Sequence, residues 1–381
     1  MRNRIYLDNA ATTPLAPEVL QEMMPYLTEC FGNPSGVYAT GREARRALEA
    51  ARERTAKAIG AEKQEIYFTS GGSESDNWAV FGAAAAGRGR HIITSAIEHH
   101  AVLRPCRQLE KQGYEVTFLP VDGTGRVDPA DVERAVRADT ALISIMTANN
   151  EIGTLQPVAE IGAIARERGI PFHTDAVQAL GAVPLDMRTM PVDLLSISAH
   201  KFHGPRGIGA LYIRRGTRIE PLIRGGAQER GLRAGTENLP GAVGLGKAAE
   251  EAVRDLESRT ERIRALRDLL IDGIREALPE ARLNGDPVNR LPGNVHFSFP
   301  GADGEALLLR MDLAGIACSG GSACTSGSTE ISHVLTALGQ DPESARGGLR
   351  MTLGDRTTEA EIRETLRTLI PLVRELRGTF R

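Results

Sequence analysis

Hydrophobic positions follow two different spacings along the first two-thirds of the chain. Short apolar runs occupy residues 65–69, 91–95, 115–120, 141–146 and 171–175, and segments with helical spacing separate them. Residues 42–59 predict an amphipathic helix that ends at Gly60, and two further apolar runs follow at 193–198 and 207–213. Short strands that alternate with helices favour a mostly parallel sheet covered by helices. The pattern therefore predicts an α/β fold.

The pattern changes after a long helical stretch at 239–278, whose composition is interrupted by Gly241, Gly244 and Gly246. Beyond it come apolar segments at 294–301 and 307–318, a helix near 331–338, a strand at 347–354 and a C-terminal helix at 358–377. This order is typical of a smaller α+β domain. We therefore predict a large α/β domain over residues 15–255 and a small α+β domain that combines residues 1–14 with residues 256–381.

Composition excludes several classes of protein. Of 381 residues, 41% are hydrophobic and 25% charged, which excludes a disordered chain and a coiled coil. The net charge of −3, the 4% of aromatic residues and the lack of a basic block argue against nucleic acid as a direct ligand. No apolar run reaches the roughly 18 residues of a membrane helix, and the first residues lack an apolar signal segment. With only four cysteines, we expect a cytoplasmic protein with reduced thiols and no membrane association.

One lysine differs from the rest in its surroundings. The chain has five, and four lie in charged or helical segments that we interpret as solvated surface: Lys57, Lys63, Lys111 and Lys247. Lys201 instead follows an apolar strand, within SISAHKFHGPRGIG, among hydroxyl, imidazole and glycine residues. Such surroundings indicate a phosphate site that contains an amine. An amine held in this way is the expected nucleophile for an aldehyde cofactor.

Pyridoxal 5′-phosphate is an aldehyde cofactor whose other requirements this sequence can meet. Its ring nitrogen needs a carboxylate, which Asp175 can supply from a strand end, and Gln178 can donate to its phenolic oxygen. Its phosphate needs a helix N-terminus and further donors. The candidates are Gly72, Ser73, Ser198 and His200, with Ser73 as helix N-cap and Asp76 in an acidic first turn. Asp175 or Ser73 alone is better explained as a helix cap, but together with Lys201 they complete a pyridoxal site.

Four other side chains are candidates for chemistry. Cys318 and Cys324 are six residues apart, which is the wrong spacing for a zinc or redox pair, so we predict no metal site. Cys318 adjoins an apolar run and is interpreted as a structural thiol. Cys324 lies among Gly, Ser, Ala and Thr, where a thiol is accessible as a nucleophile. His99 and His100 could be metal ligands, a capping pair or ring-stacking groups. Stacking of one imidazole on a flat cofactor fits the pyridoxal hypothesis better than joint chelation. Arg350, alone in an apolar strand, is either paired with an acid or reserved for a carboxylate ligand.

A series of motifs then resembles a known family. In chain order they are YLDNAATTP (6–14), SGGSESDN (70–77), EHHAVL (98–103), NNEIG (149–153), HTDAVQ (173–178), SAHKFHGPRGIG (198–209), GGAQERGLRAGTEN (225–238) and SGGSACTSG (319–327). They resemble the cysteine desulfurases, which are fold-type I pyridoxal phosphate enzymes of the class-V aminotransferase group. The resemblance runs from residue 6 to about residue 354. The SACTS segment is similar to the members with a long mobile cysteine loop, and the RxGHxCA sequence of the other group is absent.

The resemblance implies a role for each candidate. Lys201 would bind the cofactor aldehyde as a Schiff base, Asp175 and Gln178 would hold the ring, and His99 would stack on it and move protons. The phosphate would be bound by Gly72, Ser73, Ser198 and His200, and by Thr236 from the second subunit of a homodimer. Asn150, counted among the cofactor-binding residues as well, would hold the carboxylate of L-cysteine together with Arg350. Cys324, on a loop of the small domain, would take the sulfur as a persulfide while L-alanine leaves.

The implied partners are sulfur-acceptor proteins, for iron–sulfur cluster assembly or tRNA thiolation. Two details depart from the usual family pattern, Gly320 in place of a serine and Ala227 in place of a glycine. Two classes of alternative stay open. One is another enzyme of the same fold, either a selenocysteine lyase or an aminotransferase, although an aminotransferase has no use for an exposed thiol. The other is a sulfur carrier that uses Cys324 without catalysis, which would leave Lys201 and Asp175 unexplained.

Overall fold

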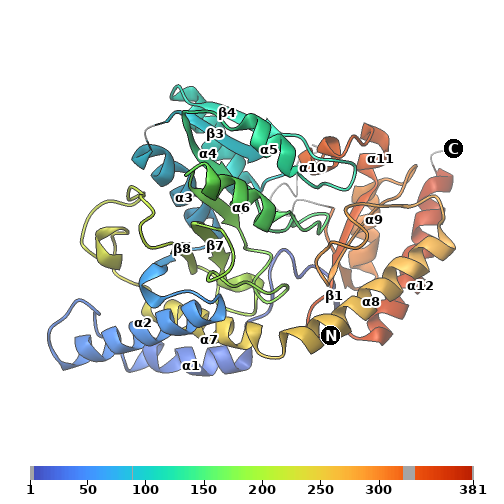
Figure 1. The fold of residues 1–381 in the computed structure, drawn as a ribbon. Coiled ribbons are helices and arrows are strands. Elements are labelled where there is room, and N and C mark those ends of the chain that lie inside the picture. The colour runs from blue at the N-terminus through green and yellow to red at the C-terminus, as the bar shows by residue number, and fades with distance from the viewer. Residues whose placement is uncertain (1–3, 88, 321–330, 380–381) are drawn as a thin grey trace.

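A computed structural model describes residues 4–87, 89–320 and 331–379, and its larger part is built on a seven-stranded sheet (Figure 1). In spatial order the strands are β2 (Ile66–Thr69), β8 (Gly209–Ile213), β7 (Leu194–Ser198), β6 (Phe172–Asp175), β5 (Thr140–Ser144), β3 (His91–Ser95) and β4 (Glu115–Leu119). β8 is antiparallel to both of its neighbours, and the other pairings are parallel. The mostly parallel α/β fold predicted from the apolar runs is confirmed.

Helices cover both faces of this sheet. α3 (Gly72–Ala86) and α4 (His100–Lys111) lie on one face, where Trp78 packs in a buried cluster with Leu142 and Leu194. On the other face the buried cluster includes Ile143 and residues of α2 (Ala39–Ala58), α6 (Val158–Glu167) and α7 (Leu239–Val253). α1 (Pro17–Thr28) packs on α7, and α5 (Pro129–Ala135) on α6.

The long helical stretch is two helices, and the glycines do not divide it. α7 ends at Val253, and α8 (Leu256–Ala277) begins after Asp255, whose φ is +34°. Gly244 and Gly246 lie inside α7. A Cβ on Gly246 would lie 2.7 Å from the backbone oxygen of Ala51, so this glycine lets α7 approach α2 closely. Their role is therefore helix packing, and the predicted stretch is divided at Asp255.

The smaller part has its own sheet and core. β10 (Asn294–Ser298) lies between β12 (Gly348–Thr352) and β9 (Arg282–Leu283) in an antiparallel sheet, and β1 (Ile5–Tyr6) pairs with β11 (Ile316–Ala317) in parallel. α8, α9 (Gly304–Leu313) and α12 (Glu359–Thr379) enclose a core with Phe297 and Leu349. Two short helices, α10 (His333–Ala337) and α11 (Pro342–Arg346), complete this part.

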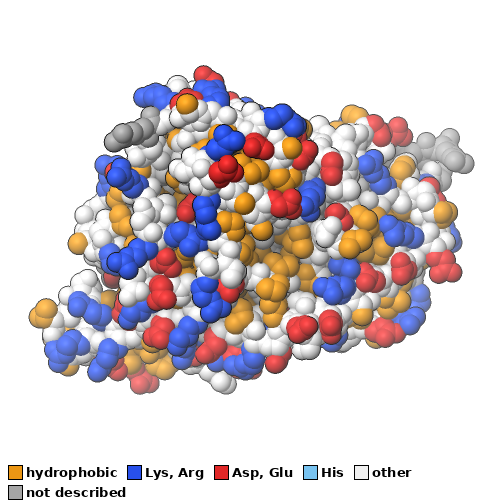
Figure 2. All heavy atoms as spheres, viewed as in Figure 1, with side chains coloured by type: hydrophobic (Ala, Val, Ile, Leu, Met, Phe, Trp, Pro, Cys, Tyr) orange, Lys and Arg blue, Asp and Glu red, His pale blue; other side chains and the backbone are white. Residues whose placement is uncertain are grey.

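The domain boundaries at residues 15 and 255 stay a prediction. They are supported by Leu7, which packs in the core of the smaller part, and by the bend at Asp255 between α7 and α8. On the face drawn in Figure 2, hydrophobic side chains gather in a hollow between the two parts. Across the described ranges, none of the helices combines the length and the apolar character that crossing a bilayer requires.

Candidate active site

The strand ends of the large sheet bring the predicted ring-binding residues together. Asp175 is the last residue of β6, and Ser198 is the last residue of the neighbouring strand β7. The chain then forms a single 3-10 turn, η2 (Ala199–Lys201), that ends with Lys201. Carboxyl ends of parallel strands are the usual binding edge of an α/β sheet. Gln178 lies in a turn just after Asp175.

The N-terminus of α3 lies against the same edge. Gly72 packs so closely that a Cβ on it would lie 2.7 Å from Val177 Cγ2 and 3.5 Å from Ser198 Cβ. The structure therefore brings Gly72, Ser73 and Ser198 together, as a phosphate site requires. The predicted capping was wrong in detail: Gly71 is the N-cap residue, and the acid of the first turn is Glu74.

The segment of residues 10–13 supports the lysine turn. Lys201 Nζ donates to the backbone oxygens of Ala10 and Ala11, at 2.5 and 2.8 Å, and Gln178 Nε2 donates to Ala10 O at 2.9 Å. His200 Nδ1 and Thr12 Oγ1 are hydrogen-bonded at 3.1 Å. The N-terminal segment thus orients Lys201, Gln178 and His200 together, a function that composition and spacing alone did not indicate.

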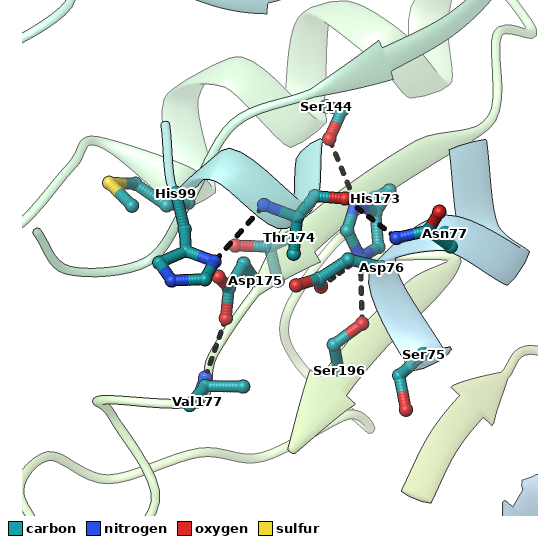
Figure 3. Close-up of polar contacts among 12 residues, drawn as sticks. Ser75, Asp76, Asn77, His99, Ser144, His173, Thr174, Asp175, Val177 and Ser196 are labelled. Atoms are coloured by element: carbon teal, nitrogen blue, oxygen red, sulfur yellow. Dashed lines mark hydrogen bonds and ion pairs between the residues drawn. The ribbon is translucent and has the colours of Figure 1, made fainter. Parts of the chain in front are cut away.

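His99 is held as a neutral ring with a defined tautomer. It is the N-cap residue of α4, and its Nδ1 accepts a hydrogen bond from Ala101 N at 3.1 Å (Figure 3). Burial, and then the positive charge of Lys201, lower the pKa of His99 to about 4. Because Nδ1 is an acceptor, the ring proton lies on Nε2. At neutral pH His99 can therefore donate a hydrogen bond from Nε2 and cannot repel a cation.

Arg350 is 1% exposed and already has an acidic partner. Its Nη2 donates to Asp8 Oδ1 at 2.9 Å, and its Nη1 donates to the backbone oxygen of Asn150, also at 2.9 Å. Its Nε has no hydrogen-bond partner among the described residues. The sequence left two alternatives for Arg350, an acidic partner or a carboxylate ligand, and the structure shows the acidic partner. A carboxylate-binding role for Asn150 and Arg350 stays a prediction.

Two cavities adjoin these residues. One, of about 740 Å³, lies between the two parts of the molecule and is lined by Lys201, Gln178 and Asn9 among others. The other, of about 530 Å³, is lined by Ser73, His99 and His100 among others. Thr236 is exposed and lines neither of them. Cys324 lies outside the described residues. Cys318 is half-buried, and burial raises the pKa of its thiol to about 12, which is the behaviour of a structural cysteine.

Sequence reasoning missed a group of buried polar side chains beneath the site. Asp76 and His173 are 1% and 0% exposed, and Glu98 is 0% exposed. Glu98 Oε1 accepts hydrogen bonds from Ser95 Oγ and Met146 N, and burial raises the pKa of Glu98 to about 8. An available signal for Asp76 was the apolar segment WAVFGAAAA that follows it, because a helix this apolar is buried on most sides. No group of three or more His, Cys, Asp or Glu side chains within the described part of the chain is arranged to hold a metal ion.

Comparisons with known proteins agree with this geometry. The family profile "Aminotransferase class-V" matches residues 5–364. Cysteine desulfurase IscS of Methanosarcina thermophila is 54% identical over 376 residues, 98% of this chain and 93% of that protein. Cysteine desulfurase IscS of Dictyoglomus turgidum is 54% identical over 99% of this chain and 96% of its own. A solved structure of a NifS-like protein superposes with a TM-score of 0.92, at 40% identity over 98% of this chain and 100% of its own. The chain therefore belongs to the class-V aminotransferase family, and within that family to the cysteine desulfurases.

These enzymes depend on pyridoxal 5′-phosphate, and the residues present fit this cofactor. An amine at Lys201, a buried carboxyl at Asp175 and a neutral imidazole at His99 meet at one edge of the sheet, beside the N-terminus of α3. Val177 N donates to Asp175 Oδ1 at 2.9 Å and fixes that carboxyl group. Together they match the aldehyde, ring nitrogen, ring face and phosphate of the cofactor.

Proposed function

We propose that this enzyme transfers the sulfur of L-cysteine to the thiol of Cys324, giving L-alanine and an enzyme persulfide. The carbon–sulfur bond of the substrate breaks and a sulfur–sulfur bond forms. The carbon keeps the bonding electron pair and takes up one proton, and the sulfur is oxidised to the persulfide level. Neither oxidant nor reductant is consumed, so atoms and electrons balance. The observation that carries the proposal is that Lys201 lies close enough to both Asp175 and His99 for its charge to act on each of them.

The chain's own side chains divide the work. When bound, pyridoxal phosphate supplies an electron sink that stabilises negative charge on the substrate. Lys201 Nζ binds the cofactor and then moves a proton at the substrate α-carbon. Asp175 holds the proton of the ring nitrogen, and His99 Nε2 donates toward the reacting atoms. Gln178, whose side chain is held by its hydrogen bond to Ala10 O, would orient the phenolic oxygen of the cofactor.

We further propose that Asn150 and Arg350 hold the substrate carboxylate. Arg350 Nη1 is bonded to Asn150 O, so the two residues already lie together, and the guanidinium is almost fully buried. A charge-assisted contact made away from water is stronger than the same contact at the surface. The phosphate of the cofactor would be bound by Gly72 N, Ser73, Ser198 and His200.

A homodimer is part of this proposal. Thr236 is exposed on the segment 225–238, and Arg233 of that segment forms a bidentate ion pair with Glu74, in the first turn of α3. The segment thus lies near one phosphate site with Thr236 turned to solvent. An isologous contact would let Thr236 reach the phosphate of the second subunit. Sulfur-acceptor proteins, for iron–sulfur cluster assembly or tRNA thiolation, would then take sulfur from Cys324 in the cytoplasm.

The test is product analysis with L-cysteine and a thiol reductant. Wild-type enzyme should release alanine and sulfide in equal amounts. Lys201→Ala should lose both products and the visible absorption of the bound cofactor, whereas the exposed control Lys57→Ala should keep them. Turnover by Lys201→Ala at the wild-type rate would contradict the assignment of the lysine. A keto acid in place of alanine would indicate a different pyridoxal reaction.

A further inference from the structure

Asp76 is a buried acid for which the described residues supply no charged basic partner. It points from α3 toward the sheet and is 1% exposed, although carboxylates are rarely buried without a cation. The basic side chain that contacts Asp76 is His173, whose Nε2 lies 3.6 Å from Asp76 Oδ1. Burial lowers the pKa of His173 to about 3, so this imidazole is neutral. Asp76 Oδ1 has no hydrogen-bond partner among the described residues.

The sheet surface below Asp76 carries a row of polar side chains. His173 and Asp175 share one face of β6, because residues two apart on a strand point to the same side. Ser144 on β5 and Ser196 on β7 are their register neighbours. His173 is hydrogen-bonded through Nδ1 to Ser144 Oγ at 2.8 Å and through Nε2 to Ser196 Oγ at 3.0 Å (Figure 3). The row therefore contains neutral groups and a single carboxyl, that of Asp175.

Asp76 adds a second carboxyl beside that of Asp175, and Figure 3 shows the two side by side. Two like charges in a region without water cannot both be ionised at little cost. Burial, and then the charge of Asp175, raise the pKa of Asp76 well above its ordinary value. Burial raises the pKa of Asp175 to about 6, and Lys201 opposes this rise. Asp175 is thus the carboxyl with a cation to stabilise its charge.

We propose that Asp76 is a positioning residue that keeps its proton at neutral pH, so that Asp175 alone is the anion presented to the cofactor ring. The proposal rests on the proposed role of Asp175 as the partner of the ring nitrogen. A neutral Asp76 packs beside Asp175 without competing with the ring nitrogen for a proton. An ionised Asp76 would place a second negative charge there and raise the pKa of Asp175 further.

The titratable groups that face Asp76 are few. His173 and Asp175 face it from β6, and Glu98 acts on it from the segment before α4. Lys201 acts on Asp175 from η2. Glu98 is a second buried carboxyl with a raised pKa, so any measurement of protonated acids must separate it from Asp76.

Infrared spectroscopy can detect the proton directly, without turnover. The C=O stretching band of a protonated carboxyl group is separate from the carboxylate bands and shifts in D2O. The spectra are recorded at neutral pH on the protein with and without pyridoxal phosphate, first in wild type and then in a Glu98→Gln background. Introducing Asp76→Asn into that background should remove the remaining buried-acid band. Asn has the size of Asp and resembles its protonated form, so the variant should fold.

A second readout follows the bound cofactor. As pH rises, wild type should ionise Asp76 and change the visible absorption of the cofactor, and Asp76→Asn should lose this alkaline change. A buried-acid band that survives Asp76→Asn, or an alkaline transition that Asp76→Asn leaves in place, would overturn the proposal. Both readouts are independent of desulfurase activity, so failure of the proposed reaction would leave them unaffected.

Discussion

The ion pair between Arg52 and Glu229 allows a sharp prediction about stability. Arg52 Nη1 and Nη2 donate to the two carboxylate oxygens of Glu229 at 2.6 and 2.8 Å, and the side chains are 3% and 2% exposed. Phe68 N also donates to Glu229, at 2.9 Å. Glu229 joins α2 to the segment 225–238, although its φ is +45°, a conformation that is uncommon outside glycine. The pair therefore anchors the segment that carries Thr236.

Glu229→Gln would keep the size of the side chain and remove the buried counter-charge of Arg52. The guanidinium would then keep only Glu49, whose side chain is 42% exposed and whose Oε1 lies 3.1 Å from Arg52 Nε. Breaking a buried pair from one side costs about 3–5 kcal/mol. An exposed pair is worth less than about 1 kcal/mol. Glu53 and Lys57 form such a pair on the same helix, with side chains 51% and 74% exposed. Glu53→Gln is therefore the matched control, with an expected loss of less than about 1 kcal/mol.

The assay is urea unfolding followed by tryptophan fluorescence. Trp78 is the single tryptophan; it is 0% exposed and donates from Nε1 to Glu220 O at 2.9 Å, so it reports on the same part of the molecule. Adding Arg52→Met to Glu229→Gln should destabilise less than the sum of the two single changes, because it removes the buried charge that has lost Glu229 as its partner. A loss below about 1 kcal/mol for Glu229→Gln would refute the reasoning.

Three further predictions concern the site. Arg350→Ala should lower kcat/KM for cysteine about 30- to 1000-fold, which is equivalent to about 2–4 kcal/mol. Asp8→Asn, which removes the charge paired with Arg350, should lower kcat/KM less. Equal losses in the two variants would mean that Arg350 serves only as the ion-pair partner of Asp8. Thr236→Val should weaken cofactor retention by about 1–2 kcal/mol, measured by dialysis, and an active monomer in sedimentation would contradict the shared site. Glu98→Gln should flatten the pH dependence of the unfolding free energy. The folded-state pKa of Glu98 is raised from 4.5 to about 8, so its contribution is full at low pH and is lost as pH rises through that range; an unchanged pH profile would exclude an ionisable role for Glu98.

Much of the fold could be predicted from the sequence because the large sheet is buried on both faces. Its strands are continuous apolar runs, and 91–95 coincides with β3. The glycines of α7 interrupt the composition of the predicted helical stretch without ending the helix, because glycine also lets helices pack closely. Lys247 was interpreted as solvated, yet it is 18% exposed and paired with Glu250 and Glu251 on its own helix.

The candidate site was predicted less completely. Lys201, Asp175 and Gly72 stood out because the chemistry of a pyridoxal site demands an amine, a carboxyl and a helix N-terminus. The contact of Lys201 with Ala10 and the pairing of Arg350 with Asp8 could not be predicted, because these residues lie more than 180 positions apart and only folding joins them. Asp76 gave a misleading signal, since an acid near the start of a helix is usually explained by the helix dipole.

The central claim is that the sulfur of cysteine passes to Cys324. The most direct measurement is peptide mass spectrometry of the enzyme after a short incubation with L-cysteine without reductant, with alkylation to trap persulfides. The account predicts one added sulfur atom on the peptide that contains Cys324, formed together with one alanine. It also predicts that Cys324→Ala keeps the bound cofactor but forms neither the persulfide nor sulfide. Added sulfur on Cys318, or sustained sulfide release by Cys324→Ala, would contradict it.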